Sequence, residues 1–472
     1  MTASTAYDAD RAPRPQPMSY GQHLRAILVL GLPLAASQLA SISLSLVDAV
    51  MLGWYAPAAL AAETVASSIF NLLFLAASGF AAALASLVAK AEASGDTTQA
   101  RRLTRMALWI SMAAGALAMP ILLSSERLLL AFGQEPEVAA MAAQYLDILA
   151  WGIFPALATM VLKAYLAALE RTRIVLIVML AAVAVNAVAN YALIFGAWGV
   201  PELGIRGAAI SSIVMHLATV AFLAAYVQRV LPEQQLFRRI WRADPESLAR
   251  VFRLGWPIGL TLVAEVGLFA ASSILMGLLG EIPLVAHGIA MQITATIFMI
   301  HLGLSQAATI RAGNAHGRGA AIDLVRGARV AIFLSVLTVI ASSLAFVTIP
   351  ERMIGLFLDP AAPAREAILA VGRTLLFAAA VFQLADAMQV MALGLLRGLQ
   401  DTRRPMIFAA ISYWVVGVPC AALLAFGLGL GGVGIWLGLA LGLTLASTLM
   451  MTRLWRSVIP AAEREIAAGP AA

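Results

Sequence analysis

The sequence is poor in charge. Only 12% of its 472 residues are Asp, Glu, Lys or Arg, whereas 62% are hydrophobic and the mean hydropathy is +0.90. A soluble globular chain carries roughly 25% charged residues, so this composition excludes an ordinary soluble domain. Apolar runs recur along the chain, and one bilayer crossing takes about 20 such residues. The composition predicts an all-α polytopic membrane protein.

Cysteine is almost absent. The single cysteine, Cys420, excludes an internal disulfide framework and a zinc cluster built on cysteine ligands. The chain also lacks an HExxH pattern, a DDxxD pair and a G-x-S-x-G elbow, so we expect no enzyme and no cofactor. The sequence pI of 9.8 is typical of basic cytoplasmic loops, and we expect no nucleic-acid partner.

Twelve apolar runs predict twelve membrane-spanning helices. Their expected ranges are 26–52, 59–88, 103–123, 139–165, 174–196, 205–228, 250–279, 284–310, 324–347, 367–394, 405–427 and 433–454. Residues 1–22 are polar, contain proline and lack the apolar core of a signal peptide. We therefore divide the chain into a cytoplasmic tail (1–22), an N-lobe of helices 1–6 (23–229), a cytoplasmic linker (230–249), a C-lobe of helices 7–12 (250–456) and a second cytoplasmic tail (457–472).

The connections between these helices alternate in charge. Most of the 31 basic residues lie on one set of connections, and this set includes Lys163, Arg171 and Arg173. The other set holds only Arg127, Arg206, Arg352, Arg365 and Arg373. Because positive charge stays on the cytoplasmic side of a membrane, both termini are predicted to be cytoplasmic.

The two halves resemble each other at a fixed offset. Pro33 matches Pro257, which lies 224 residues later, and "VLGLPLA" lies over "RLGWPIG" at the same separation. Each half has six predicted helices and starts on the same side, so the repeats are parallel and related by an axis along the membrane normal. This predicts two six-helix lobes around a central cavity.

Three carboxylates lie within the apolar runs: Asp48, Glu265 and Asp386. A charged acid at the centre of a lone helix costs about 2.5–3.5 kcal/mol on insertion scales, so such residues normally face a cavity or a partner. Glu63 falls near a helix end and is expected to be an ordinary interfacial group. No lysine or arginine lies deep enough to neutralise the three acids convincingly. The interior is therefore predicted to attract cations.

Further polar residues share helix faces with these acids. They are Ser41 with Asp48, Thr261 with Glu265, Gln383 and Gln389 with Asp386, and the pair Asn186 and Asn190 one turn apart. Such stripes either bond helices to one another or line a cavity. His216, His287 and His301 also lie within spans, and packing and a role in coupling both stay open for them.

Four segments carry a resemblance to a known family. They are "VDAVMLG" (47–53), "NAVANYALIFG" with "PELGIRGAA" (186–209), "AEVGLF" (264–269) and "ADAMQVMALGLLRGLQDTRRP" (385–405). With these, the chain resembles the multidrug and toxic compound extrusion family, in particular its bacterial NorM-like branch. The likeness spans nearly the whole chain, and the last segment is the most specific.

The resemblance implies a secondary active antiporter of the bacterial inner membrane. It would export cationic or aromatic drugs and dyes in exchange for Na⁺ or H⁺ by alternating access, and we expect it to act as a monomer. The acids matching Glu265 and Asp386 would form the C-lobe cation site, where Na⁺ is a candidate ligand. Asp48, with Asn186 and Asn190, would form an N-lobe site.

Three alternatives are less favoured by these residues. A lipid-linked oligosaccharide flippase of the same superfamily would handle an anionic pyrophosphate and would need basic residues inside its cavity. An intramembrane enzyme would need a catalytic motif. An ion channel would pass current without exchanging a substrate.

Overall fold

The computed structural model describes residues 17–468, and all regular secondary structure within them is helical. The first half contains α1 (Tyr20–Tyr55), α2 (Pro57–Ala93), α3 (Thr97–Leu123), α4 (Ser125–Ala131), α5 (Pro136–Ala168), α6 (Thr172–Phe195), η1 (Ala197–Gly199), α7 (Ile205–Val230) and η2 (Pro232–Gln234). The second half contains α8 (Pro245–Gly277), α9 (Glu281–Gly317), α10 (Ala321–Thr348), α11 (Pro350–Gly355), α12 (Arg365–Gly398), α13 (Arg403–Ala410), η3 (Ile411–Gly417), α14 (Val418–Ala422), η4 (Leu423–Gly427), α15 (Gly431–Arg453), η5 (Leu454–Val458) and α16 (Ile459–Ala468).

The described residues form twelve helical stretches that are long and apolar enough to cross a membrane. The fold class predicted from composition is therefore confirmed. Two stretches combine several elements, namely 403–427 and 431–468. In the first of these, Pro419 cannot donate a backbone hydrogen bond, and the π-helical turns η3 and η4 lie on either side of it.

The helix ends differ from the expected domain boundaries. Helix α1 begins at Tyr20, inside the expected tail 1–22, because Ser19 and Gln22 form a capping box there. Residues 1–16 of that tail lie outside the described residues. The connection between the halves is shorter than the expected linker 230–249, since α7 ends at Val230 and Asp244 caps α8 from Pro245 onward.

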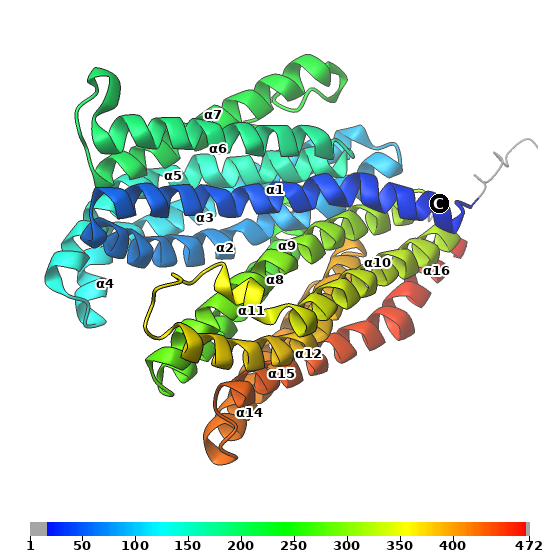
Figure 1. Ribbon diagram of the computed structural model, residues 1–472. Helices are drawn as coiled ribbons and strands as arrows, with labels where there is room; N and C mark the ends of the chain where they lie inside the picture. Colours follow the sequence, from blue (N-terminus) through cyan, green and yellow to red (C-terminus); the bar gives the residue numbers. More distant parts are fainter. Residues whose placement is uncertain (1–16, 469–472) are drawn as a thin grey trace, which may run out of the picture.

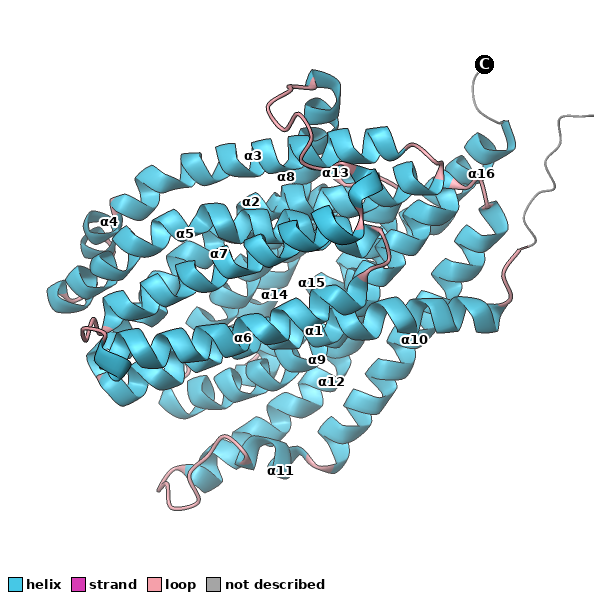
Figure 2. Ribbon diagram, turned by 90° about the horizontal axis from the view of Figure 1, so that it is seen from above, coloured by secondary structure: helices cyan, strands magenta, loops and turns pink. Residues whose placement is uncertain are grey.

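The expected C-terminal tail, 457–472, is helical as far as Ala468. Its helix α16 buries Ile459 and Ala462 and packs against α10, so apolar burial continues the helix beyond the last predicted span. Residues 469–472 lie outside the described part of the chain. The start of α1 and the end of α16 lie at the same end of the molecule, opposite the short helices α4 and α11 (Figures 1 and 2).

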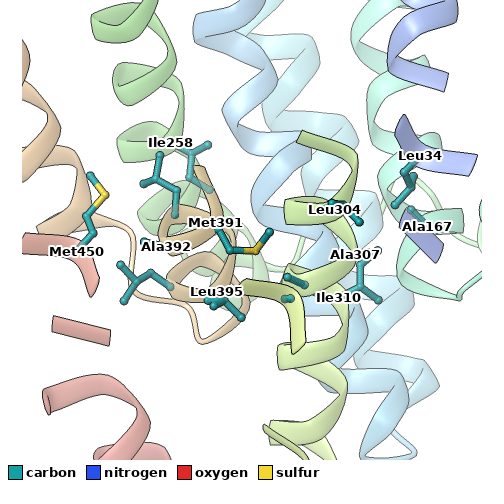
Figure 3. Close-up of a cluster of buried hydrophobic side chains, with 14 of the residues drawn as sticks. Leu34, Ala167, Ile258, Leu304, Ala307, Ile310, Met391, Ala392, Leu395 and Met450 are labelled. Carbon is teal, nitrogen blue, oxygen red and sulfur yellow. The ribbon is translucent and has the colours of Figure 1, made fainter. Parts of the chain in front are cut away.

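The two halves form two bundles, and they diverge toward the end that carries α4 and α14 (Figure 1). Contacts between the bundles are made mainly by α1 and α2 of the first half with α8 and α9 of the second. Figure 3 shows part of the buried apolar cluster at this junction. Its labelled members are Leu34, Ala167, Ile258, Leu304, Ala307, Ile310, Met391, Ala392, Leu395 and Met450.

Glycine allows the closest approaches between the halves. A Cβ atom added to Gly259 of α8 would overlap the backbone of Ala76 in α2, and one added to Gly303 of α9 would overlap Ala35 in α1. Glycine here lets two helix backbones pack at short range, as in other helix pairs within membranes. Both crossings lie near the middle of their helices.

A polar contact joins the halves at the terminal end. Glu170, in the turn between α5 and α6, accepts a hydrogen bond from Asn314 Nδ2 of α9 at 2.6 Å. Arg311 Nη1 lies 3.6 Å from the same Glu170 oxygen. The junction therefore combines apolar packing with a charged contact between an N-half turn and a C-half helix.

The glycine crossing leads to a prediction. Gly259→Ala places a methyl group against the Ala76 carbonyl, and such overpacking typically costs about 1–3 kcal/mol. We expect this variant to unfold at lower temperature in detergent. Gly288→Ala, also in a spanning helix, is the control, because a Cβ there meets nothing within 4 Å. Equal stability of the two variants would contradict the packing argument.

Candidate functional site

A cavity of about 240 Å³ lies within the first half. Its ionisable side chains are Asp48, Glu63, Tyr145, Lys163 and His216. Hydroxyl groups of Ser41, Ser45, Ser67, Thr159, Ser212 and Thr219 and the rings of Phe70 and Phe74 complete most of its wall. The cavity thus combines opposite charges with aromatic surface, a lining suited to an amphipathic small molecule.

Asp48 is held by a hydrogen-bond chain that starts on α6. Asn190 Nδ2 donates to Asp48 Oδ1 at 2.5 Å and lies 3.4 Å from Asn186 Oδ1. Asn186 Nδ2 in turn lies 3.5 Å from Ser211 Oγ of α7. Residues one turn apart share a helix face, which is why the two asparagines form one chain. The structure therefore brings together the predicted group Asp48, Asn186 and Asn190.

Glu63 belongs to the same cavity, and the expectation of an ordinary interfacial group was wrong. Its side chain is only 7% exposed, close to the 8% of Asp48. Ser67, one turn later on α2, donates its hydroxyl to Glu63 Oε1 at 2.5 Å. The expected helix started at residue 59 and placed Glu63 at its end, whereas α2 starts at Pro57. The spacing from Glu63 to Ser67 to Phe70 would have indicated a cavity face.

Lys163 overturns the expectation that no fixed base approaches the acids. The sequence places it on a cytoplasmic connection, but α5 continues to Ala168 and keeps Lys163 within the helix. There it lines the cavity together with Asp48 and Glu63. The predicted span 139–165 already contained Lys163, so the error was to count this residue with the basic connection that follows the helix.

A second, smaller pocket of about 120 Å³ lies between the halves and shares Lys163 and Met160 with the first cavity. Arg397 of α12 lies in its wall, with Gln38 of α1 and Gln306 of α9. Arg397 follows the predicted span 367–394, and the sequence pattern therefore placed it on the cytoplasmic connection with Asp401–Arg404. Asp401 does anchor that turn, because it accepts a hydrogen bond from Arg453 Nε at 2.5 Å. Arg397, however, lines the pocket between the halves.

The predicted C-half residues form a separate buried group. Glu265 of α8 and Asp386 of α12 are 8% and 2% exposed, and their charges act on each other. Gln383 and Gln389 are fully buried on the face of Asp386, and Tyr413 of η3 lies within electrostatic range of both acids. The three elements therefore bring together the residues that the polar stripe predicts, and they add Tyr413, which the sequence did not single out.

Several atoms of this group have unused hydrogen-bonding capacity. Within residues 17–468, the buried atoms without a partner include Glu265 Oε1, Asp386 Oδ1, Tyr413 Oη and both amide atoms of Gln383 and Gln389. Buried polar atoms are normally satisfied by a protein group, water or an ion. Carboxylate and amide oxygens are the donors that hard cations prefer. The donor set thus fits a small cation with water, although the described residues hold no group of three or more His, Cys, Asp or Glu side chains arranged for a metal.

Other predicted residues have local roles. Ser41 lines the N-half cavity but donates its hydroxyl to Ser37 O at 3.0 Å. Thr261 donates to Pro257 O at 2.7 Å within its own helix, so its hydroxyl is already satisfied.

The three histidines are placed differently from one another. His216 lines the N-half cavity. His287 receives a hydrogen bond from Trp436 Nε1 at 3.2 Å, and His301 Nδ1 lies 3.0 Å from Ser335 Oγ.

Two segments of the chain match one protein-family model. The model described as MatE matches residues 33–192 and 257–423. The two matches start 224 residues apart, at Pro33 and Pro257, which is the separation that the sequence repeat predicts. The family model therefore detects the same internal repeat as the direct comparison of the two half-sequences.

Curated relatives match over nearly the full length. A probable multidrug resistance protein NorM of Rhizobium meliloti (strain 1021) is 43% identical over 96% of this chain and 97% of its own length. One of the same name from Agrobacterium fabrum is 41% identical, over 92% and 94%. A solved structure described as MATE in the bent conformation superposes with a TM-score of 0.84, at 19% identity, over 96% of this chain and 100% of that one.

The Asp48–Asn190 hydrogen bond can be tested with a double-mutant cycle. Asp48→Ala and Asn190→Ala each remove one partner, and leaving a buried polar group without a partner costs about 1–3 kcal/mol. We expect the double variant to lose at least about 1 kcal/mol less stability than the sum of the two single variants. Chemical unfolding in detergent provides the four values. Additive losses would show that the two side chains do not interact.

Proposed function

We propose a cation-coupled exchange cycle on the premise that this chain belongs to the MatE family and is a multidrug efflux transporter of a bacterial membrane, not an enzyme. In this cycle the protein exports cationic, often aromatic, compounds and imports H⁺ or Na⁺. The observation that carries the proposal is the pair of buried carboxylates, Asp48 and Glu63, in one aromatic cavity with Lys163.

The charge balance of that cavity provides a mechanism for exchange. With Asp48 and Glu63 ionised and Lys163 protonated, the cavity carries one net negative charge and attracts a cationic drug. The rings of Phe70 and Phe74 add stacking and cation–π surface. One proton on either carboxylate brings the net charge to zero and removes the attraction. Proton binding from outside and drug release to the outside are then coupled by the same groups.

The C-half group serves as a second cation site in this proposal. Glu265 and Asp386 supply two carboxylates, and Gln383 and Gln389 supply amide oxygens, so the group accepts either H⁺ or Na⁺. It need not touch the drug. Two ligands are coupled whenever they prefer different conformations of the same protein. We propose coupling at Glu265 and Asp386, at Asp48, or at both.

Alternating access would proceed by movement of the two halves, residues 23–229 and 250–456, about their junction. The halves pack together at the end that holds the chain termini and diverge at the other end (Figure 1). With the basic connections on the cytoplasmic side, this arrangement is open to the outside. Opening inward would separate Glu170 from Arg311 and Asn314 and unpack the glycine crossings.

Location and assembly follow from the same argument. We propose a monomer in the inner membrane with both termini in the cytoplasm, because each half finds its packing partner within the same chain. The charge alternation supports the orientation. A reporter fused after Ala472 that is active only in the cytoplasm would test it.

One observation favours a second candidate function. Lys163 and Arg397 line the pocket between the halves, and basic residues there are what a flippase for lipid-linked pyrophosphates would need. The adjoining carboxylates Asp48 and Glu63 oppose an anionic substrate, which is why drug export remains our proposal. Transport of a lipid-linked oligosaccharide by the purified protein would favour the flippase function over drug export.

The C-half acids lead to a prediction about coupling. In liposomes, an imposed pH or Na⁺ gradient should drive ethidium transport, and the gradient that does so identifies the ion. Asp386→Asn and Glu265→Gln should each lower gradient-driven transport by about tenfold or more, because a neutral amide no longer exchanges its charge. Proton release and Na⁺-dependent binding, measured on one sample, would show which acid binds the ion.

Thr261→Val is the matched control on α8. It lies one turn from Glu265, and its hydroxyl is bonded to its own helix, so transport should change little. If neither gradient drives transport, or if Asp386→Asn transports like the wild type, the coupling proposal fails.

Lys163 leads to a prediction about substrate charge. Lys163→Met changes the proposed net charge of the cavity from −1 to −2 and should tighten ethidium binding by about tenfold, the order expected for a unit charge in a partly screened site. A zwitterionic fluoroquinolone should gain less, since its carboxylate loses the ammonium group. Lys90→Met is the control, because Lys90 is on the terminal end of α2 and pairs with Glu465. Weaker ethidium binding in Lys163→Met would refute the charge balance.

A further inference from the structure

A large basic pocket lies far from the transport cavities, between α3 and the connection that joins the halves. Its volume is about 450 Å³. Six arginines and one aspartate are its charged lining residues: Arg101, Arg102, Arg105, Arg238, Arg239, Arg242 and Asp244. The pocket is therefore strongly positive, and none of the transport steps above uses it.

Hydrogen bonds between side chains of α3 and the backbone of the connection hold this pocket in shape. Arg105 of α3 is only 5% exposed, and its Nη1 donates to the carbonyls of Arg238 at 3.3 Å and Arg239 at 2.8 Å. Trp109 Nε1 donates to Ile240 O at 3.0 Å. These bonds fix the connection against α3. They use the backbone of the connection, and the side chains of Arg238, Arg239 and Arg242 line the pocket, with Arg238 Nη1 also donating to Gln235 Oε1 at 2.8 Å.

The positive charge is only slightly compensated within the described residues. Arg102 Nε lies 3.8 Å from Asp244 Oδ2, and this is the one acid in the lining. Burial disfavours ionisation of Asp244, but hydrogen bonds from Ser247 and the charges of Arg102 and Arg105 outweigh it and lower the pKa of Asp244. Arg105 Nε is buried without a partner. One ionised carboxylate thus faces six guanidinium groups.

The surroundings indicate where the neutralising anion comes from. Trp241, next to Arg242 in the connection, is 74% exposed, and Phe252 on the first turns of α8 is 51% exposed. Tryptophan and basic residues at the ends of spanning helices are typical of the membrane–water interface. Basic pockets at this level bind the head groups of anionic lipids.

We infer that this pocket binds the phosphate-bearing head group of an anionic phospholipid from the leaflet at the terminal end of the molecule. Guanidinium groups bind phosphate oxygens through paired hydrogen bonds. Six of them in 450 Å³ provide for more than one phosphate, so a diphosphatidyl lipid is the preferred ligand. The bound lipid holds the connection between the halves against α3 and links the N-half to the start of α8.

The test compares two triple variants of the full chain. Arg238→Gln, Arg239→Gln and Arg242→Gln remove three lining side chains but keep the carbonyls that Arg105 binds. The control changes Arg171, Arg173 and Arg229 to Gln. These exposed arginines lie outside the pocket lining. Arg171 directly precedes α6, Arg173 is in the first turn of α6, and Arg229 is at the end of α7.

Native mass spectrometry with added cardiolipin, phosphatidylglycerol or phosphatidylethanolamine gives the number of bound lipids and their affinity. We expect the wild type to prefer cardiolipin. The pocket variant should bind it about a hundredfold more weakly, at roughly fivefold per arginine, while the control stays within a few-fold of the wild type. Melting curves in detergent without lipid should be the same for both variants.

Three results would overturn the inference. An equal loss of cardiolipin affinity in both triple variants would mean that binding depends only on the overall positive charge of this surface. Displacement of cardiolipin by millimolar inorganic phosphate would make this a site for a soluble anion. Equal binding of phosphatidylethanolamine would mean that the anionic head group is not recognised.

Discussion

A carboxylate within a membrane-spanning bundle needs hydrogen bonds or an opposite charge from the protein, or from water or an ion in a cavity, because the bilayer core supplies neither. Asp48 receives a hydrogen bond from Asn190 of α6, and Glu63 receives one from Ser67 of its own helix. Lys163 adds a charge of opposite sign to the same wall. In the proposed cycle, Asp48, Glu63 and Lys163 together give this cavity one net negative charge. This small imbalance lets one proton change the net charge of the cavity, whereas a fully paired site would resist that change.

The internal repeat duplicates the backbone of the two halves but not their charges. Gly31 and Pro33 of α1 have counterparts in Gly255 and Pro257 of α8, and α1, α2, α8 and α9 form the junction. The acids differ. Asp48 of the N-half is hydrogen-bonded in an open cavity, whereas Asp386 of the C-half is almost completely buried beside amide groups with unused hydrogen-bonding capacity. Because the two environments differ, the halves are suited to different ligands. In the proposed cycle the drug binds in the aromatic N-half cavity, and a small cation binds to the buried oxygen atoms of the C-half.

The sequence predicted the helices, the repeat and the groups around Asp48 and Asp386, because these depend on hydropathy and on spacing along one helix. It did not predict the roles of Glu63, Lys163 and Arg397. Glu63 and Lys163 lie inside the predicted spans 59–88 and 139–165, but their places near the helix ends led to their assignment to an interface and to a connection. Arg397 lies three residues beyond the predicted span 367–394, and for it the boundary error was decisive. Arg397 also depends on how the halves meet, since its pocket is built from both of them. The helical pattern within one half carries no information about that junction.

The sequence also did not predict the different contacts that the arginines of the connections make. Counting basic residues on connections treats all of them as equivalent markers of orientation. In the structure, Arg453 pairs with Asp401 and closes a turn, and Arg105 binds backbone carbonyls and fixes a connection. Arg238 and Arg242 instead face a pocket whose charge the protein itself leaves largely uncompensated. Only this last group needs an anion from outside the chain. With the proposed orientation and lipid site, positive charge that orients the helices during insertion also binds, in the folded protein, the leaflet that it faces.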